Sequence, residues 1–183
     1  GIKHHCWLCI NPKEAEDIGF AREVISLIPD FIDCDNVLGI GEIGLNKNSK
    51  NELLILEEQL ALAEQLQQLV LVHTPHLEDK LKGTNLIMDA IENTSLSPDR
   101  VLIDHVEEHT VRAVLDRGYW AGMTLYPDSK CTPQRAADII EMHGTERLWI
   151  NSAGDWGPSD PLAVPKCRVE LASRGHSSSL IDT

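Results

Sequence analysis

The sequence lacks several features that would assign it to common functional classes. It has no apolar run of the ~18 residues that a membrane span requires. Its 16 Lys and Arg residues are outnumbered by 29 Asp and Glu, so the formal net charge is -13. A surface this acidic repels polyanions and argues against a broad nucleic-acid groove. The G-x-S-x-G nucleophile elbow of serine hydrolases is absent too. We therefore expect no membrane and no nucleic-acid partner, and a small-molecule substrate.

Cysteine is also scarce, and its placement argues against a disulfide scaffold. The chain has 5 cysteines in 183 residues, an odd and scattered set. Such a set fits a reducing compartment and predicts a cytoplasmic protein. Cys6 and Cys9 form a C-x-x-C motif that could suggest a zinc or redox site. In a strand, however, the two side chains would face opposite sides, so buried strand cysteines are the favoured interpretation.

Short apolar runs alternate with helix-like segments along the chain. The alternation predicts about six βα units in one α/β domain spanning 1–183, with a parallel sheet and helical crossovers. The pattern leaves two architectures open, an open doubly wound sheet and a (β/α)₈ barrel. The predicted strands are 6–10, 37–41, 69–73, 101–103, 120–125 and 148–150. The predicted helices cover 12–28, a stretch from about 51, 110–118 and 132–144, with a last one after Pro165.

The stretch GIGEIG at 39–44 has the spacing of a dinucleotide-binding loop. That loop needs a helix that begins within the motif and an acidic residue about 20 positions on, at the end of the next strand. Here the next helix is expected near Asn51, and the acidic residue at that distance, Glu64, falls inside it. We therefore place Gly39 and Gly41 in a strand that ends at Glu42. An NAD-binding oxidoreductase using Gly39–Gly44 is kept as a weaker alternative.

Metal-ligating side chains follow four of the predicted strands. Glu42, His73 and His105 come at or just after strand ends, and Asp155 follows the last strand. Parallel strands place their carboxyl ends at one edge, where α/β folds carry out chemistry. Imidazole and carboxylate groups that converge there are ligands for Zn²⁺ or Mn²⁺. Asp104, next to His105, is expected to face away from the site and to have a structural role.

At these residues the sequence resembles the TatD-related metal-dependent hydrolases of the amidohydrolase superfamily, over 3–166. The motifs are GEIGL at 41–45, VHTPH at 72–76, IDH at 103–105 and NSAGDWG at 151–157. The resemblance implies a (β/α)₈ TIM barrel with one or two divalent ions (Zn, Mn or Mg) at its rim. It implies that Glu42 bridges two ions, that His73 and His105 bind the second, and that Asp155 binds the first and accepts the proton of the attacking water.

The implied reaction is hydrolysis of an ester, amide, lactone or phosphoester by metal-activated water. His76, Tyr126 and Trp156 are candidate substrate-binding residues because they lie at strand ends. Nuclease members of the family have Arg and an acidic residue after the histidine that corresponds to His73. This chain has Thr74-Pro75-His76 there, which weakens a DNase interpretation.

One departure from the family concerns its first strand, which carries an H-x-H metal-binding pair. No H-x-H occurs here, and the adjacent His4 and His5 would face opposite sides of a strand. We therefore expect an incomplete barrel whose first two βα units precede Gly1, and the two missing ligands argue against activity of this chain by itself. The alternative is a non-catalytic fragment or binding scaffold of the same fold. The sequence does not determine the oligomeric state.

Overall fold

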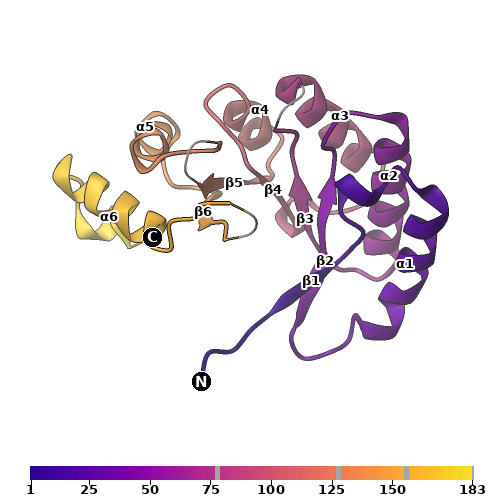
Figure 1. The fold of residues 1–183 in the computed structure, drawn as a ribbon. Helices are drawn as coiled ribbons and strands as arrows, with labels where there is room; N and C mark the ends of the chain where they lie inside the picture. The colour runs from indigo at the N-terminus through magenta and orange to yellow at the C-terminus, as the bar shows by residue number, and fades with distance from the viewer. Residues whose placement is uncertain (77–78, 127–128, 155–156, 183) are drawn as a thin grey trace. The chain divides into compact units, whose positions relative to one another are not determined.

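A computed structural model describes residues 1–76, 79–126, 129–154 and 157–182. The chain forms two compact units, Gly1–Ile103 and Asp104–Thr183. Six strands alternate with helices, and the pairs β1–β2, β2–β3 and β5–β6 are parallel, which confirms the predicted α/β class (Figure 1). Within the described residues, no helix is both long and apolar enough to cross a membrane.

The first unit holds β1 to β3, the start of β4 and three α-helices. Helices α1, α2 and α3 lie on the same side of the strands β1, β2 and β3 (Figure 1). Ile40 and Ile43 of β2 and Leu56 of α2 are completely buried, so this strand and helix share one core. The bounds are β1 Cys6–Leu8, a 3-10 turn Pro12–Glu14, α1 Ile18–Phe31, β2 Val37–Gly44, α2 Lys50–Gln65, β3 Leu69–His73, α3 Lys80–Glu92, a 3-10 turn Pro98–Arg100 and β4 Val101–Asp104.

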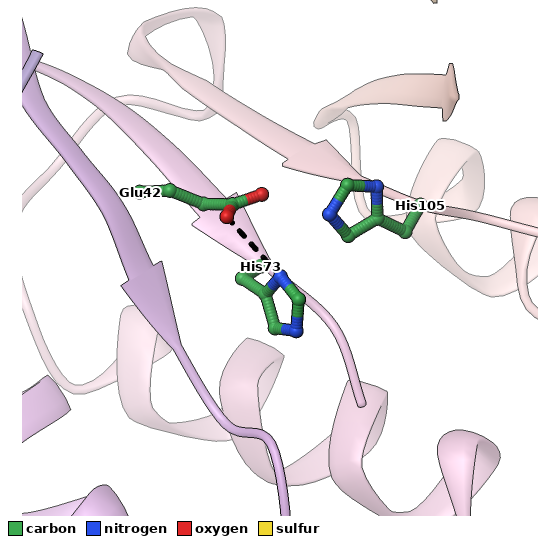
Figure 2. A group of neighbouring side chains, drawn as sticks. All are labelled: Glu42, His73 and His105. Carbon is green, nitrogen blue, oxygen red and sulfur yellow. Dashed lines mark ion pairs between the residues drawn. The ribbon is translucent and has the colours of Figure 1, made fainter. Parts of the chain in front are cut away.

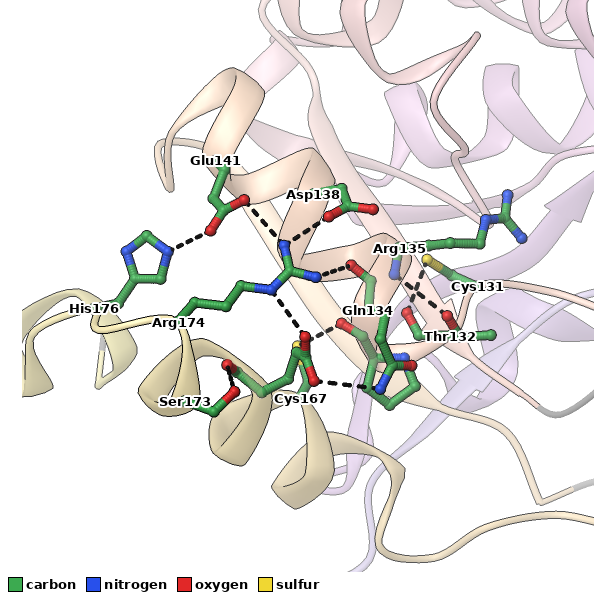
Figure 3. Close-up of polar contacts among 12 residues, drawn as sticks. Cys131, Thr132, Gln134, Arg135, Asp138, Glu141, Cys167, Ser173, Arg174 and His176 are labelled. Carbon is green, nitrogen blue, oxygen red and sulfur yellow. Dashed lines mark hydrogen bonds and ion pairs between the residues drawn. The ribbon is translucent and has the colours of Figure 1, made fainter.

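The second unit begins at the last residue of β4 and is built around β5 and β6. Its Arg174 guanidinium, at the end of α6, lies 2.6 Å from Asp138 and 2.9 Å from Glu141 on α5 (Figure 3). It also lies 2.8 Å from Glu170 of α6. The pairs with Asp138 and Glu141 attach the end of α6 to α5. The bounds are α4 Val111–Asp116, β5 Trp120–Leu125, α5 Pro133–His143, β6 Leu148–Ser152, α6 Ala163–Ser173 and α7 Ser178–Ile181.

Several predicted bounds were wrong, each for a local reason. Strand β2 continues to Gly44 instead of ending at Gly41, because pairing with β3 resumes beyond a bulge between Ile40 and Ile43. The predicted first helix is a 3-10 turn followed by α1, because the Asp17 carboxylate caps a new helix by accepting the Phe20 N–H. Strand β1 ends at Leu8, so Cys9 lies after the strand rather than in it.

Other local predictions are confirmed. The glycines of GIGEIG lie in a strand, and α2 begins at Lys50, six residues after the motif. No helix N-terminus therefore meets these glycines as a dinucleotide loop requires. Thr132 caps α5, Pro133 is its first residue and Gly144 follows its end.

Glu52, in the first turn of α2, holds the loop that follows β2. Its carboxylate is 1% exposed and accepts backbone N–H groups of Asn46 (3.2 Å), Lys47 (2.9 Å) and Ser49 (3.1 Å). The Ser49 hydroxyl completes a capping box by accepting the Glu52 N–H. The carboxylate thus fixes the chain that leaves the Glu42 strand.

We expect Glu52→Ala to lower the free energy of unfolding by about 2–4 kcal/mol, because it leaves several backbone donors without their charged acceptor. Glu57→Ala is the matched control, since Glu57 is an exposed residue of the same helix and its removal should change stability by no more than ~0.5 kcal/mol. Urea denaturation of both variants measures the difference. Equal stabilities would contradict the assigned role.

Candidate metal centre

The bulge in β2 positions the first candidate ligand. Between the pairs Ile40–Val70 and Ile43–Val72, β2 has one residue more than β3, so Gly41 and Glu42 share the irregular stretch. The peptide bond between them is cis. A Cβ on Gly41 would stand 2.6 Å from Leu71 Cβ and 2.7 Å from Leu71 O. The motif therefore needs glycine there because β2 and β3 approach too closely for a side chain.

Glu42 and His73 meet across the neighbouring ends of β2 and β3. The Glu42 Oε2 atom lies 3.2 Å from His73 Nδ1, as Figure 2 shows. His73 is the last residue of β3 and is 7% exposed, whereas Glu42 is half-buried. A carboxylate oxygen and an imidazole nitrogen at this separation form the start of a ligand set for a divalent ion.

His105, the third candidate, lies in the second unit directly after β4 (Figure 2). It is 8% exposed and has a positive φ of 62°. Its Nδ1 lies 2.6 Å from the Thr124 hydroxyl of β5. Within the described residues, Glu42, His73 and His105 make up the candidate metal group. Their chemistry, one carboxylate and two imidazoles, fits Zn²⁺ or a similar ion.

The other predicted site residues are placed differently. His76 is half-buried in the loop after β3 and is not a member of this group. Tyr126 is half-buried at the end of β5 and lines a cavity of about 590 Å³ with residues of α5 and α6. Asp155 and Trp156 lie outside the described residues.

The C-x-x-C motif does not behave as a thiolate site. Burial, aided by the negative charge of Glu42, raises the pKa of the Cys9 thiol to about 12, so it is protonated at neutral pH. Its sulfur donates a hydrogen bond to the Glu42 carbonyl at 3.3 Å. Cys6 and Cys9 are half-buried rather than buried, and both are free thiols. Cys9 therefore packs against the bulge, and it is not a member of the candidate metal group among the described residues.

Comparison with known proteins agrees with this arrangement. The sequence profile described as TatD related DNase matches residues 2–150. The chain belongs to the TatD-related family. An uncharacterized metal-dependent hydrolase of Methanocaldococcus jannaschii is 30% identical over 152 residues, which are 83% of this chain and 59% of that protein. The chain thus spans about three-fifths of the length of this curated relative.

Solved structures show the same relationship. The TatD-like protein of Archaeoglobus fulgidus is 28% identical, with a TM-score of 0.71, and the match covers 96% of this chain and 67% of that one. The phosphotriesterase homology protein of Escherichia coli shares the fold, with a TM-score of 0.66 at 14% identity. That match covers 88% of this chain and 61% of the Escherichia coli chain. The neighbours of this TatD-related chain have the TIM-barrel type of fold.

Sequence reasoning gave Asp104 only a structural role away from the site, and it missed Thr124 and Lys130. Asp104 is 5% exposed and accepts the His105 backbone N–H at 2.7 Å. The Thr124 hydroxyl lies between the two side chains, and Lys130 Nζ lies 3.3 Å from each ring nitrogen of His105. The IDH motif put Asp104 beside a candidate ligand, which is a signal for it. Nothing in the sequence pairs Thr124 or Lys130 with His105, because they are 19 and 25 residues away.

Proposed function

We propose that the protein is a divalent-metal-dependent hydrolase of small molecules, in which Glu42, His73 and His105 hold one ion. The observation that carries the proposal is the Glu42–His73 pair at adjacent strand ends, 3.2 Å apart and largely shielded from water. Membership of the TatD-related family and the metal-dependent hydrolase among its relatives support it. Because the chain spans 59% of that relative, the activity is proposed for the whole protein.

The chemistry follows from the residues in the group. A divalent ion bound there would lower the pKa of a coordinated water from ~15.7 toward ~7 and polarise the oxygen of the scissile bond. Glu42 balances part of the added positive charge, and the two imidazoles donate neutral nitrogen ligands. Asp155, by the family resemblance, would accept the proton of the attacking water. Zn²⁺, Mn²⁺ and Mg²⁺ are all candidate ions, and a second ion is part of the proposal for the whole protein.

Lys130 bears on the substrate class. Its ammonium lies beside His105 and 6.0 Å from the centre of the Tyr126 ring. A cation beside a candidate ligand would pair with a substrate oxygen that carries negative charge. Among esters, amides, lactones and phosphoesters, this favours a phosphoester or a carboxylate-bearing substrate. His76, Tyr126 and Trp156 remain proposed substrate contacts.

We expect the protein to hydrolyse activated substrates such as p-nitrophenyl acetate or bis(p-nitrophenyl) phosphate only with metal present. Chelation should lower the rate at least 100-fold, since the protein would lose the activated water. Elemental analysis should find about one Zn²⁺ or Mn²⁺ per chain, and none in a Glu42→Ala, His73→Ala, His105→Ala variant.

The matched control combines Glu57→Ala with His109→Ala, because both residues are exposed and lie outside the candidate group. This variant should keep both metal and activity. Metal without hydrolysis would favour a binding scaffold. Hydrolysis that survives chelation and the triple variant would overturn the proposal.

A further inference from the structure

Asp104 is the hub of a buried hydrogen-bond network in the second unit. Its Oδ1 accepts the His105 N–H at 2.7 Å and the Thr124 hydroxyl at 3.1 Å, and its Oδ2 accepts the Asn151 side-chain N–H at 2.9 Å. Asp104 is 5% exposed and Thr124 is 1% exposed. The network joins the ends of β4, β5 and β6 at one carboxylate.

The packing on β5 is shaped around this carboxylate. A Cβ on Gly122 would stand 2.4 Å from Asp104 Oδ1, so only glycine leaves room for the oxygen. The Gly122 carbonyl accepts the Val106 N–H at 2.9 Å, which fixes the chain on the other side of His105. His105 is thus held in the left-handed region, with φ of 62°, by contacts on both sides.

The direction of each hydrogen bond follows from the donors available. Carboxylate oxygens only accept, so the Thr124 hydroxyl must donate its single hydrogen to Asp104. Its oxygen then has only lone pairs to offer His105 Nδ1, 2.6 Å away, and Nδ1 must carry the hydrogen. A neutral imidazole with hydrogen on Nδ1 leaves the lone pair on Nε2. Lys130 Nζ lies 3.3 Å from each ring nitrogen, so the assignment rests on the Thr124 hydroxyl alone.

We infer that Asp104 is a positioning residue, which acts through the Thr124 hydroxyl to hold His105 as the Nδ1–H tautomer, so that the lone pair that a metal ion would use lies on Nε2. Histidines that bind metals commonly donate their other N–H to such an acceptor, which orients the ring and raises its basicity. The unusual feature here is a threonine hydroxyl inserted between histidine and carboxylate. The inference rests on the proposed metal centre for its purpose, but the tautomer itself is independent of metal.

The tautomer is measured first, by ¹⁵N NMR of the metal-free protein with labelled histidine, with the His105 signals assigned by a His105→Ala variant. In the neutral imidazole of His105, we expect the hydrogen on Nδ1. Finding it on Nε2 in the unmodified protein would overturn the inference without any variant. This arm does not depend on whether the protein is a hydrolase.

Variants then test the relay, by which we mean the contact from Asp104 through the Thr124 hydroxyl to His105. Thr124→Val removes the hydroxyl at nearly constant volume, and we expect a mixed tautomer and 10–100-fold weaker Zn²⁺ binding by calorimetry. Thr124→Ser should restore both readings. Thr84→Val is the matched control, because the Thr84 hydroxyl is also completely buried but donates only within its own helix, to the Lys80 carbonyl at 2.8 Å.

Three results would decide against the relay. An unchanged tautomer and Zn²⁺ affinity in Thr124→Val would overturn it. Weaker Zn²⁺ binding with an unchanged tautomer would show that Thr124 is merely structural. Equal losses in Thr84→Val would do the same. If the unmodified protein binds no Zn²⁺, the proposed function fails, while the NMR measurement still decides the tautomer.

Discussion

A hundredfold excess of Zn²⁺ over its Kd is expected to raise the free energy of unfolding by about 2.7 kcal/mol, because the ion binds the folded chain only. The folded state presents a buried His73 and a Glu42 oxygen 3.2 Å apart, whereas the unfolded chain has no such pair. The stabilisation should rise by a further ~1.4 kcal/mol for each tenfold increase in ion concentration.

A Glu42→Gln, His73→Ala variant should lose this stabilisation almost completely. Glutamine keeps the size of Glu42 but removes its charge, and alanine removes the His73 nitrogen ligand. The matched control pairs Glu57→Gln with His109→Ala, two exposed residues, and should respond to Zn²⁺ as the unmodified chain does. Thermal melts across a Zn²⁺ series provide the measurement. A variant that is still stabilised as strongly as the unmodified chain would place the ion elsewhere.

Replacing Gly44 by alanine is expected to lower the free energy of unfolding by about 2–6 kcal/mol, the sum of overpacking and backbone strain. Gly44 has φ of 146°, and a Cβ there would stand 2.1 Å from the His73 carbonyl oxygen. The neighbouring atoms are backbone, so no side chain can rotate away. The substitution should also weaken Zn²⁺ binding, because the added methyl group would displace the backbone of His73, which is a candidate ligand.

Gly19→Ala is the control for Gly44→Ala. Gly19 is exposed in the first turn of α1, where the nearest atom to an added Cβ is an Asp17 oxygen at an ordinary 3.5 Å. Alanine there should leave stability unchanged or raise it by up to ~1 kcal/mol. Guanidinium denaturation compares the two variants. A Gly44→Ala protein as stable as Gly19→Ala would show that β2 and β3 can separate at no cost.

The sequence by itself determined the order of the elements and the identity of the candidate ligands. Apolar runs that lead to Glu42, His73 and His105 are local signals, since each residue lies at or near the end of its own strand. The start of α2 at Lys50, well after GIGEIG, could also be predicted from the sequence. It distinguishes this motif from a dinucleotide-binding loop, in which the helix begins within the glycine motif. The placement of the chain in one domain and the role of Asp155 stay predictions.

Only the tertiary structure decided how these residues are held. The bulge that carries Glu42 depends on the register of β2 against β3, and register is set by packing between strands rather than by either strand alone. Asp104 was expected to turn away from the site, because alternation along β4 was extended through His105. The left-handed turn at His105 breaks that alternation and brings the carboxylate to Thr124 and Asn151, which lie 20 and 47 residues further along the chain. Contacts at such separations leave no periodic trace in a single sequence, so they emerge only once the strands are packed.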